Sequence, residues 1–217
     1  EEAEQYHMAS VCVPSSFVKK IRQHFPSFTI CTVVGFPLGN GSTAAKVAET
    51  ASAIADGADE IDIVLNVGRM LTGEYDEAAN EVEVIRSEMD GDIVLKVIIE
   101  SGALKTPDLI RKASLLSMFA GADFVKTSTG KIDVAATPEA AVVMCQAIRD
   151  YYEKTGRKVG FKAAGGVRTA EDGALYYTIV EEILGKEWLT TDLFRIGASS
   201  AANNILSAIE GREIKYF

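Results

Sequence analysis

Two lysines and one aspartate are placed in this sequence where reacting groups could lie. Lys126 and Lys162 each lie toward the end of a short β-favouring run and precede a turn that contains glycine, and Asp62 lies within a third such run. Because side chains alternate along a strand, each lysine shares a face with residues that a fold would bury. Burial disfavours the ammonium form of a lysine and makes its free amine available as a nucleophile.

These three side chains together predict chemistry through an imine. Paired strands lie about 4.8 Å apart, so Lys126 and Lys162 would be close if their strands are adjacent. Two neighbouring ammonium groups repel, one can release its proton, and the resulting amine forms a Schiff base with a carbonyl. Asp62 would then move protons, directly or through water. The alternatives are that Lys126 is a surface lysine and that Lys162 and Asp62 form a salt bridge without chemistry.

Two turns further along the chain predict a phosphate site. Gly165 and Gly166 follow the Lys162 strand, and Gly197, Ser199 and Ser200 follow the last predicted strand. Each turn opens a helix, where backbone N–H groups and the helix dipole favour an anion. Either turn alone is a common type of loop, but the pair indicates a substrate that carries a phosphate.

The elements that must position these residues alternate along the whole chain. An internal repeat, in which residues 55–62 resemble residues 119–126, has the spacing of βαβ units. Thr106, Thr137 and Thr169 are predicted N-caps of helices. The predicted strands cover residues 10–13, 29–34, 60–65, 93–99, 124–126, 159–162 and 193–196.

Alternation of strands and helices predicts an α/β fold with a parallel sheet covered by helices. We predict a (β/α)8 TIM barrel, a single domain over residues 1–217, whose first strand is missing from this chain because the sequence opens with a helix. The alternative is a doubly wound sheet. Against it, no Gly-x-Gly-x-x-Gly follows the first strand, and polar residues point to one face of several strands.

Composition limits the classes of partner and the compartment. The 217 residues are 47% hydrophobic and 24% charged with a net charge of −9, which argues against a nucleic acid or membrane partner. Cys12, Cys31 and Cys145 are widely spaced and suggest neither a disulfide framework nor a metal site. With no apolar run long enough to span a membrane and an acidic start unlike a secretory signal, we expect a cytoplasmic protein.

The sequence resembles the deoxyribose-phosphate aldolase family along nearly its whole length. Lys-Thr-Ser-Thr-Gly followed by Lys-x-Ala-Gly-Gly is the most specific part of the resemblance. The matching stretches are residues 33–39, 57–63, 95–100, 121–130, 160–169 and 195–200. The resemblance implies a TIM-barrel lyase that reversibly cleaves 2-deoxy-D-ribose 5-phosphate to D-glyceraldehyde 3-phosphate and acetaldehyde through a lysine Schiff base. It also implies a role in deoxynucleotide catabolism. The implied reaction requires no cofactor and no metal.

The resemblance implies a role for each matching residue. Lys126 is implied as the Schiff-base lysine, Lys162 as the neighbouring cation that promotes loss of the Lys126 proton, and Asp62 as part of the proton relay. The implied phosphate-binding residues are Gly130, Lys131, Gly165, Gly166, Gly197, Ser199 and Ser200.

Several features stay open at this point. Cys12 lies in a strand that the family places near the site, or it is a small buried filler. Ala163 stands where many members have proline or serine, and Tyr216-Phe217 either folds over the site or frays. The competing functions are a transaldolase-like enzyme with a longer sugar substrate and a phosphate-sugar binding protein without turnover. The sequence does not distinguish a monomer from a homodimer.

Overall fold

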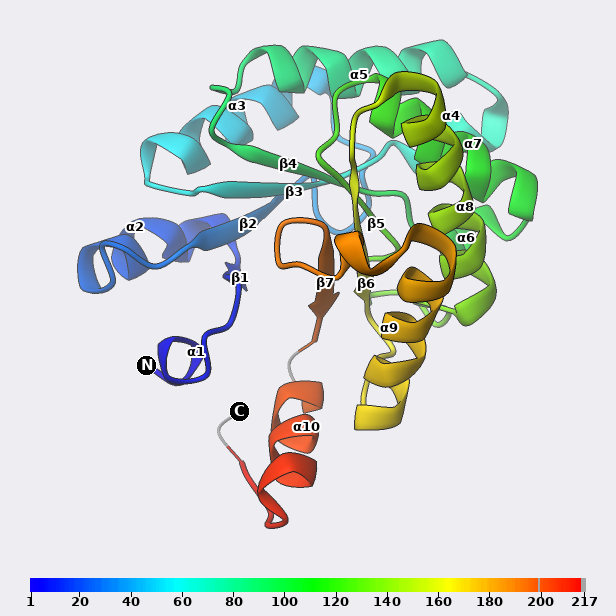
Figure 1. Ribbon diagram of the computed structural model, residues 1–217. Helices are drawn as coiled ribbons and strands as arrows, with labels where there is room; N and C mark the ends of the chain where they lie inside the picture. The colour runs from blue at the N-terminus through cyan, green and yellow to red at the C-terminus, as the bar shows by residue number, and fades with distance from the viewer. Residues whose placement is uncertain (199, 216–217) are drawn as a thin grey trace.

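A computed structural model describes residues 1–198 and 200–215, which form a curled parallel sheet with helices outside it (Figure 1). Its strands pair in the order β1-β2-β3-β4-β5-β6-β7, so each strand lies beside the next one along the chain. All seven predicted strands are present with small changes at their ends. Their bounds are β1 (Val11–Val13), β2 (Ile30–Val34), β3 (Glu60–Val64), β4 (Val94–Ile98), β5 (Phe124–Lys126), β6 (Gly160–Ala164) and β7 (Phe194–Gly197).

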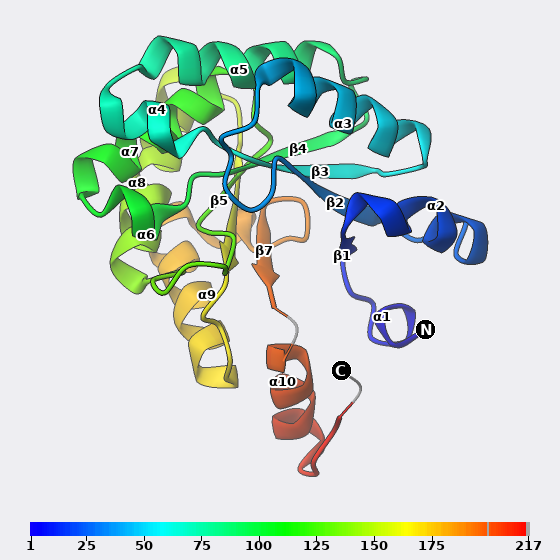
Figure 2. The same cartoon turned by 180° about the vertical axis from the view of Figure 1, so that it is seen from behind.

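Helices connect successive strands and cover the outer face of the sheet, as Figure 2 shows from behind. The main helices after the strands are α2 (Ser15–His24), α3 (Thr43–Ala55), α5 (Tyr75–Ser87), α7 (Pro107–Phe119), α8 (Pro138–Thr155), α9 (Ala170–Leu184) and α10 (Ser200–Glu210). The short helices are α1 (Glu2–Gln5), α4 (Val67–Thr72), α6 (Ser101–Leu104) and η1 (Lys186–Trp188); the sequence did not predict α4, α6 or η1.

The helix starts follow the predicted local signals. The side chains of Thr106, Thr137 and Thr169 each accept a hydrogen bond from a backbone N–H in the first turn of the following helix. Pro107 and Pro138 occupy the first helical position, where the missing N–H costs no hydrogen bond. These starts fix where the chain leaves the loops that surround the site.

The strand order excludes the doubly wound alternative. A doubly wound sheet reverses its strand order at a switch point, whereas this order runs from β1 to β7 without reversal. The chain has seven of the eight strands that a (β/α)8 barrel contains, and in the described residues β1 and β7 are the two free edges. A cavity of about 400 Å³ lies between these edges, lined in part by Cys12, Lys162 and Arg195.

Alternation along the strands separates an apolar outer layer from a polar interior. Ile61 and Ile63 belong to the hydrophobic core that the sheet forms with the helices, while Asp62 between them is fully buried. Asp62 is paired in register with Lys96, and Lys126 with Lys162. The register therefore puts charged groups of neighbouring strands side by side. Within the part of the chain that the structure describes, we find no helix with the length and apolar character that a membrane span requires.

Candidate active site

The carboxylate of Asp62 is the centre of the polar interior. Its Oδ2 accepts hydrogen bonds from Nζ of Lys126 at 2.7 Å and of Lys162 at 2.8 Å. Its Oδ1 lies 3.0 Å from Nζ of Lys96 and accepts from the Cys31 thiol at 3.1 Å. The three residues singled out from the sequence, on β3, β5 and β6, are thus in direct contact.

Competition between burial and charge sets the protonation of this group. Burial would raise the pKa of Asp62, but the ammonium groups of Lys126, Lys162 and Lys96 outweigh burial and hold that pKa well below its usual range. Burial would lower the pKa of Lys162, but the Asp62 carboxylate, with smaller contributions from Cys31 and Cys12, raises that pKa on balance. The same balance, chiefly with Asp62, raises the pKa of Lys96. Asp62 is therefore a carboxylate at neutral pH, and Lys96 and Lys162 are ammonium groups.

A second ion pair supports the first, and the sequence reasoning did not assign it a role. Lys96 Nζ contacts Glu60 Oε2 at 2.6 Å, and Arg195 Nη2 contacts Glu60 Oε1 at 3.0 Å. Burial would raise the pKa of Glu60, but Lys96 and Arg195 lower it. The signal in the sequence that could have found Lys96 is that it shares a strand face with Glu100, four residues further along.

The site has an excess of positive charge. Among the residues just described, four side chains are cationic and two are anionic. The cations are Lys96, Lys126, Lys162 and Arg195, and the anions are Asp62 and Glu60. Loss of one lysine proton would therefore reduce repulsion within the group. The same excess favours a substrate with a negative charge.

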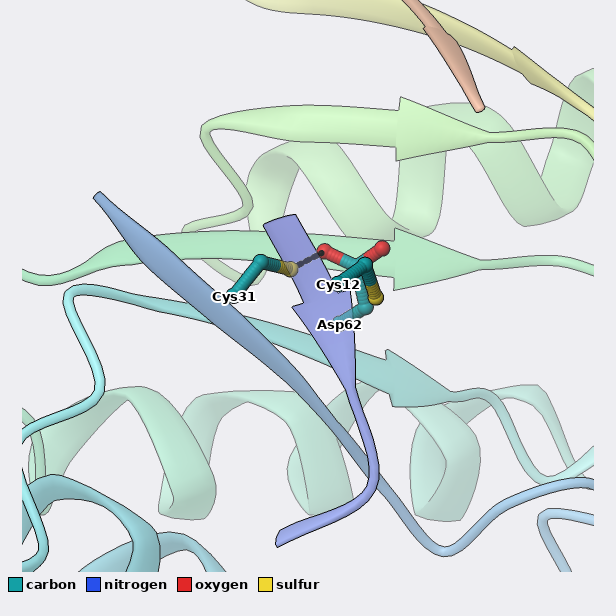
Figure 3. A group of neighbouring side chains, drawn as sticks. All are labelled: Cys12, Cys31 and Asp62. Atoms are coloured by element: carbon teal, nitrogen blue, oxygen red, sulfur yellow. Dashed lines mark hydrogen bonds between the residues drawn. The ribbon is translucent and has the colours of Figure 1, made fainter. Parts of the chain in front are cut away.

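Two cysteines complete the interior beside Asp62, as Figure 3 shows. Cys12 on β1 and Cys31 on β2 are register partners; Cys12 is exposed and Cys31 is buried. A hydrogen bond from Cys31, followed by the charges of Lys126 and Lys162, lowers the pKa of Cys12 to about 7 against burial and the charge of Asp62. The suggestion that Cys12 is a buried filler is therefore wrong.

Three or more histidine, cysteine, aspartate or glutamate side chains that lie close together could hold a metal ion. Among the described residues, one such group is found, and it consists of Cys12, Cys31 and Asp62, whose ligand atoms lie within 4.8 Å of one another. Cysteine spacing in the sequence did not reveal this group because its members come from three strands. Lys126 and Lys162 already donate to the Asp62 carboxylate. A divalent cation there would have to displace these ammonium groups, so the donor set fits a metal poorly.

The predicted glycine turns meet beside the lysines. Gly130, Gly165 and Gly166 have φ of +73°, +73° and +82°, a region that favours glycine. A Cβ at Gly165 would lie 2.8 Å from the Gly130 Cα, so the turns after β5 and β6 pack closely. A Cβ at Gly197 would lie 3.1 Å from Cε of Lys162, so the turn after β7 reaches the same site.

The remaining residues singled out from the sequence either lie near these turns or fall outside the residues that the structure describes. Lys131 is exposed in the loop after β5, and Ala163 is fully buried in β6. Ser199 lies outside the described residues, as does the Tyr216-Phe217 tail. Ser200 begins α10, but its side chain is also outside the description.

Glu100 is a further residue to which the sequence reasoning gave no role. It is buried with φ of +53°, a strained conformation for a residue with a side chain. Its carboxylate accepts hydrogen bonds from Thr129 N at 3.2 Å and Thr129 Oγ1 at 2.5 Å. The hydroxyl of Ser128 donates to Ala164 O at 2.6 Å. The turn after Lys126 is therefore held from both neighbouring strands.

Comparisons with known proteins agree on one family. The model of the DeoC/LacD family aldolases matches residues 1–187. A deoxyribose-phosphate aldolase of Agrobacterium fabrum (strain C58) is 43% identical over 208 residues, covering 94% of this chain and 79% of that protein.

Solved structures give the same result. A protein of Coccidioides immitis assigned to the deoxyribose-phosphate aldolases is 31% identical, with a TM-score of 0.81 over 96% of this chain and 76% of that chain. A deoxyribose phosphate aldolase of Aeropyrum pernix, described as tetrameric, is 26% identical, with a TM-score of 0.77 over 96% of this chain and 80% of that chain.

Proposed function

The chain belongs to the DeoC/LacD family of aldolases, and from this premise we propose that it reversibly cleaves 2-deoxy-D-ribose 5-phosphate to D-glyceraldehyde 3-phosphate and acetaldehyde. The observation that carries the proposal is the contact of Lys126 and Lys162 with the single carboxylate of Asp62. An enzyme of this class is a carbon–carbon lyase, and its place is in the breakdown of deoxyribonucleotides.

Lys126 is the residue that forms the Schiff base in this proposal. Lys126 is the lysine of the Lys-Thr-Ser-Thr-Gly stretch shared with the family, and it lies at the end of β5 in contact with Asp62. The amine adds to the substrate aldehyde carbon, and loss of water gives a protonated imine. Lys162 is the neighbouring cation in this proposal: it is the register partner of Lys126 on β6, and its Nζ lies 2.8 Å from the same carboxylate.

Proton transfers complete the reaction. The protonated imine accepts the electron pair of the broken carbon–carbon bond, a sugar hydroxyl loses its proton, and D-glyceraldehyde 3-phosphate leaves. The enamine left on Lys126 gains a proton, and hydrolysis releases acetaldehyde. Asp62 lies 2.7 Å from Lys126 Nζ and would transfer these protons directly or through water.

The glycine turns are proposed to hold the substrate phosphate. Gly130, Gly165, Gly166 and Gly197 carry no side chain that would keep an anion away from the backbone, and the excess of positive charge nearby favours the anion. From the sequence pattern, Lys131, Ser199 and Ser200 join this set. The phosphate would then fix the distance from the aldehyde carbon to Lys126.

Trapping of the imine tests the proposal. The protein is incubated with acetaldehyde and borohydride, and modified peptides are mapped by mass spectrometry. We expect an ethyl group on Lys126, none in a Lys126→Arg variant, and an unchanged adduct in a matched Lys105→Arg variant, since Lys105 is exposed. An adduct on Lys162 instead would reverse the two lysine roles. Folded protein with no adduct on any lysine would favour a binding protein without turnover.

Substrate comparison separates the proposal from a transaldolase-like enzyme. We expect acetaldehyde to serve as donor with D-glyceraldehyde 3-phosphate as acceptor, and ketose donors to give no product. Turnover of ketose donors in preference to acetaldehyde would indicate the longer-sugar enzyme.

We also propose that residues 1–217 act as one domain, because one continuous sheet runs through them, and that two copies associate as a homodimer. The Aeropyrum pernix relative is described as tetrameric, which supports self-association in this family. Sedimentation velocity tests the homodimer.

A cytoplasmic location is supported by the free thiols of Cys12, Cys31 and Cys145.

A further inference from the structure

Cys12 and Cys31 lie side by side on two neighbouring parallel strands. Their Cα atoms are register partners on β1 and β2, so both side chains point to the same side of the sheet. Both sulfur atoms lie within 4.8 Å of each other and of an Asp62 oxygen (Figure 3). The mechanism proposed above uses neither thiol.

The two cysteines differ in ways that suit successive steps of an oxidation. Cys12 lines the same interior space as Lys162, which an aldehyde substrate must enter, so a small oxidant can reach Cys12 by the route of the substrate. Its pKa of about 7 leaves a substantial thiolate fraction at neutral pH, and the thiolate is the form that reacts. Cys31 is buried, and hydrogen bonding to Cys12 together with burial raises its pKa, so it stays protonated until its partner is oxidised.

We propose that Cys12 and Cys31 form a peroxide-sensitive dithiol, in which Cys12 is the site of oxidation and Cys31 the resolving cysteine. The Cys12 thiolate attacks one oxygen of hydrogen peroxide, which breaks the O–O bond and gives a sulfenic acid and hydroxide. The Cys31 sulfur then attacks the Cys12 sulfur. The S–O bond breaks, and the departing hydroxide takes the Cys31 proton and leaves as water. Two thiols and one peroxide thus give one disulfide and two waters.

The backbone distance permits this bond. Paired strands are separated by about 4.8 Å. Disulfides usually join Cα atoms about 4.4 to 6.8 Å apart, so rotation of the two side chains suffices. Cys145 offers no such route, because it is buried in α8 within the hydrophobic core and burial raises its pKa.

The disulfide would act on the Asp62 site. The Cys31 thiol donates to Asp62 Oδ1 at 3.1 Å and accepts from Lys96 Nζ at 3.6 Å. Oxidation removes the Cys31 proton and turns its sulfur toward Cys12, so Asp62 loses a donor. A loss of aldolase activity of about tenfold follows, since hydrogen bonds to charged groups are among the stronger ones. This effect on activity rests on the proposed function, whereas formation of the disulfide does not.

Peptide mapping of the full chain tests the dithiol. The protein is treated with a small excess of hydrogen peroxide, denatured, alkylated with iodoacetamide and digested. We expect a linked Cys12–Cys31 peptide that lacks two hydrogen atoms, and Cys145 recovered as the alkylated thiol. Dithiothreitol should restore both free thiols. Recovery of Cys12 and Cys31 as alkylated thiols after peroxide treatment would overturn the proposal.

Variants identify the role of each cysteine. In Cys31→Ala the oxidation should stop at a Cys12 sulfenic acid that dimedone traps, and in Cys12→Ala neither product should form. Cys145→Ala is the matched control and should form the linked peptide as the wild type does. A dimedone adduct on Cys31 in the Cys12→Ala variant would overturn the assigned order.

Activity is measured in parallel with the map, and each sample is compared with its own untreated protein. The wild type and Cys145→Ala should lose activity with peroxide and regain it with dithiothreitol, and Cys12→Ala, which forms neither oxidation product, should keep the activity of its untreated sample. A disulfide that leaves turnover unchanged would overturn the regulatory effect. A protein that forms the disulfide but shows no aldolase activity before oxidation would contradict the proposed function alone.

Discussion

Asp62 has one negative charge and contacts the ammonium groups of Lys96, Lys126 and Lys162. No single pair of these residues is a simple salt bridge, because each ammonium group competes with the others for the same carboxylate. The Asp62 carboxylate is both the base nearest to Lys126 and the group that keeps the neighbouring lysines charged. At the scale of single residues, the proposed chemistry therefore depends on this carboxylate.

Replacement of Asp62 by asparagine should reduce both turnover and stability. The amide cannot accept a proton in the reaction, so kcat should fall by about 10² to 10⁴. The variant also leaves buried ammonium groups without their counterion, which should cost about 3–5 kcal/mol of unfolding free energy. Steady-state rates and urea unfolding measure the two effects.

The matched control for this replacement is Asp92→Asn, since Asp92 is exposed in the loop before β4. It should change neither quantity appreciably. Wild-type turnover in Asp62→Asn would mean that protons move by a route without this carboxylate.

At the scale of elements, the turns after β5 and β6 form one unit. Gly130 packs against Gly165, and Ala136 N donates to Gly165 O at 3.1 Å. Glu100, two residues after β4, fixes Thr129 in the first of these turns. The glycines thus allow close approach, while hydrogen bonds from neighbouring elements set the position of the turns.

Replacement of Gly165 by alanine should weaken binding of the phosphorylated substrate. The new Cβ would lie 2.8 Å from the Gly130 Cα, so the two turns must separate, and φ of +73° adds a strain of about 1–2 kcal/mol. We expect KM for 2-deoxyribose 5-phosphate to rise, with less change for unphosphorylated 2-deoxyribose.

Gly156 provides the control for backbone strain. It has φ of +70° at the end of α8, and a Cβ there would have no atom within 4 Å. Gly156→Ala should therefore lose only the stability that backbone strain costs, while KM stays unchanged. An equal rise of KM in both variants would show that strain, rather than contact between the turns, is responsible.

Replacement of Glu100 by glutamine should also act through the turn after β5. The variant loses the charge that strengthens two hydrogen bonds from Thr129, worth about 1.5–3 kcal/mol each. We expect KM for the phosphorylated sugar to increase more than KM for the unphosphorylated one. Glu74→Gln, at an exposed position, is the control. Equal changes for both sugars would argue that Glu100 only stabilises the fold.

At the scale of the whole molecule, the charged interior joins most of the sheet. Asp62 on β3 contacts lysines on β4, β5 and β6, and Glu60 on β3 contacts Arg195 on β7. These contacts make the stability of the sheet depend on the protonation of a few groups.

Stability should decline at both extremes of pH. The pKa values of Asp62 and Glu60 are lowered by folding, so their contribution is present above about pH 4 and is lost as the pH falls through the lower folded values. The pKa values of Lys96 and Lys162 are raised, so their contribution is complete below about pH 10.4 and is lost as the pH rises above it. Urea unfolding across the pH range measures both limbs.

A Glu60→Gln variant tests the acid limb. Its unfolding free energy should be lower at neutral pH and should fall less steeply below pH 4 than that of the wild type, because one of the two carboxylates no longer titrates. Asp92→Asn should follow the wild-type curve. An unchanged slope in Glu60→Gln would mean that other carboxylates control acid unfolding.

Much of the fold could be predicted because its signals are local. The threonine caps at Thr106, Thr137 and Thr169 and the β-branched runs each depend on a few consecutive residues, and their order alone indicates a parallel sheet. Asp62 and Lys126 hold equivalent positions in the repeat, and Lys162 lies toward the end of the next predicted strand, so the proximity of these three residues could be predicted. The short helices α4 and α6 were not predicted, because they are too brief to show a periodic pattern.

The sequence by itself determined the alternation of elements, the polar faces of the strands and the residues most suited to imine chemistry. Only the tertiary structure decided that Lys96 shares the Asp62 carboxylate, that Glu60 joins Lys96 to Arg195, and that Cys12 faces Cys31. The physical reason is that backbone preferences act over a few residues, whereas these contacts depend on the register and curvature of the sheet. The neighbouring residues in the sequence predict which face of a strand a charged side chain lies on. Its partner cannot be predicted in this way, because the partner lies on another strand that only packing brings beside it.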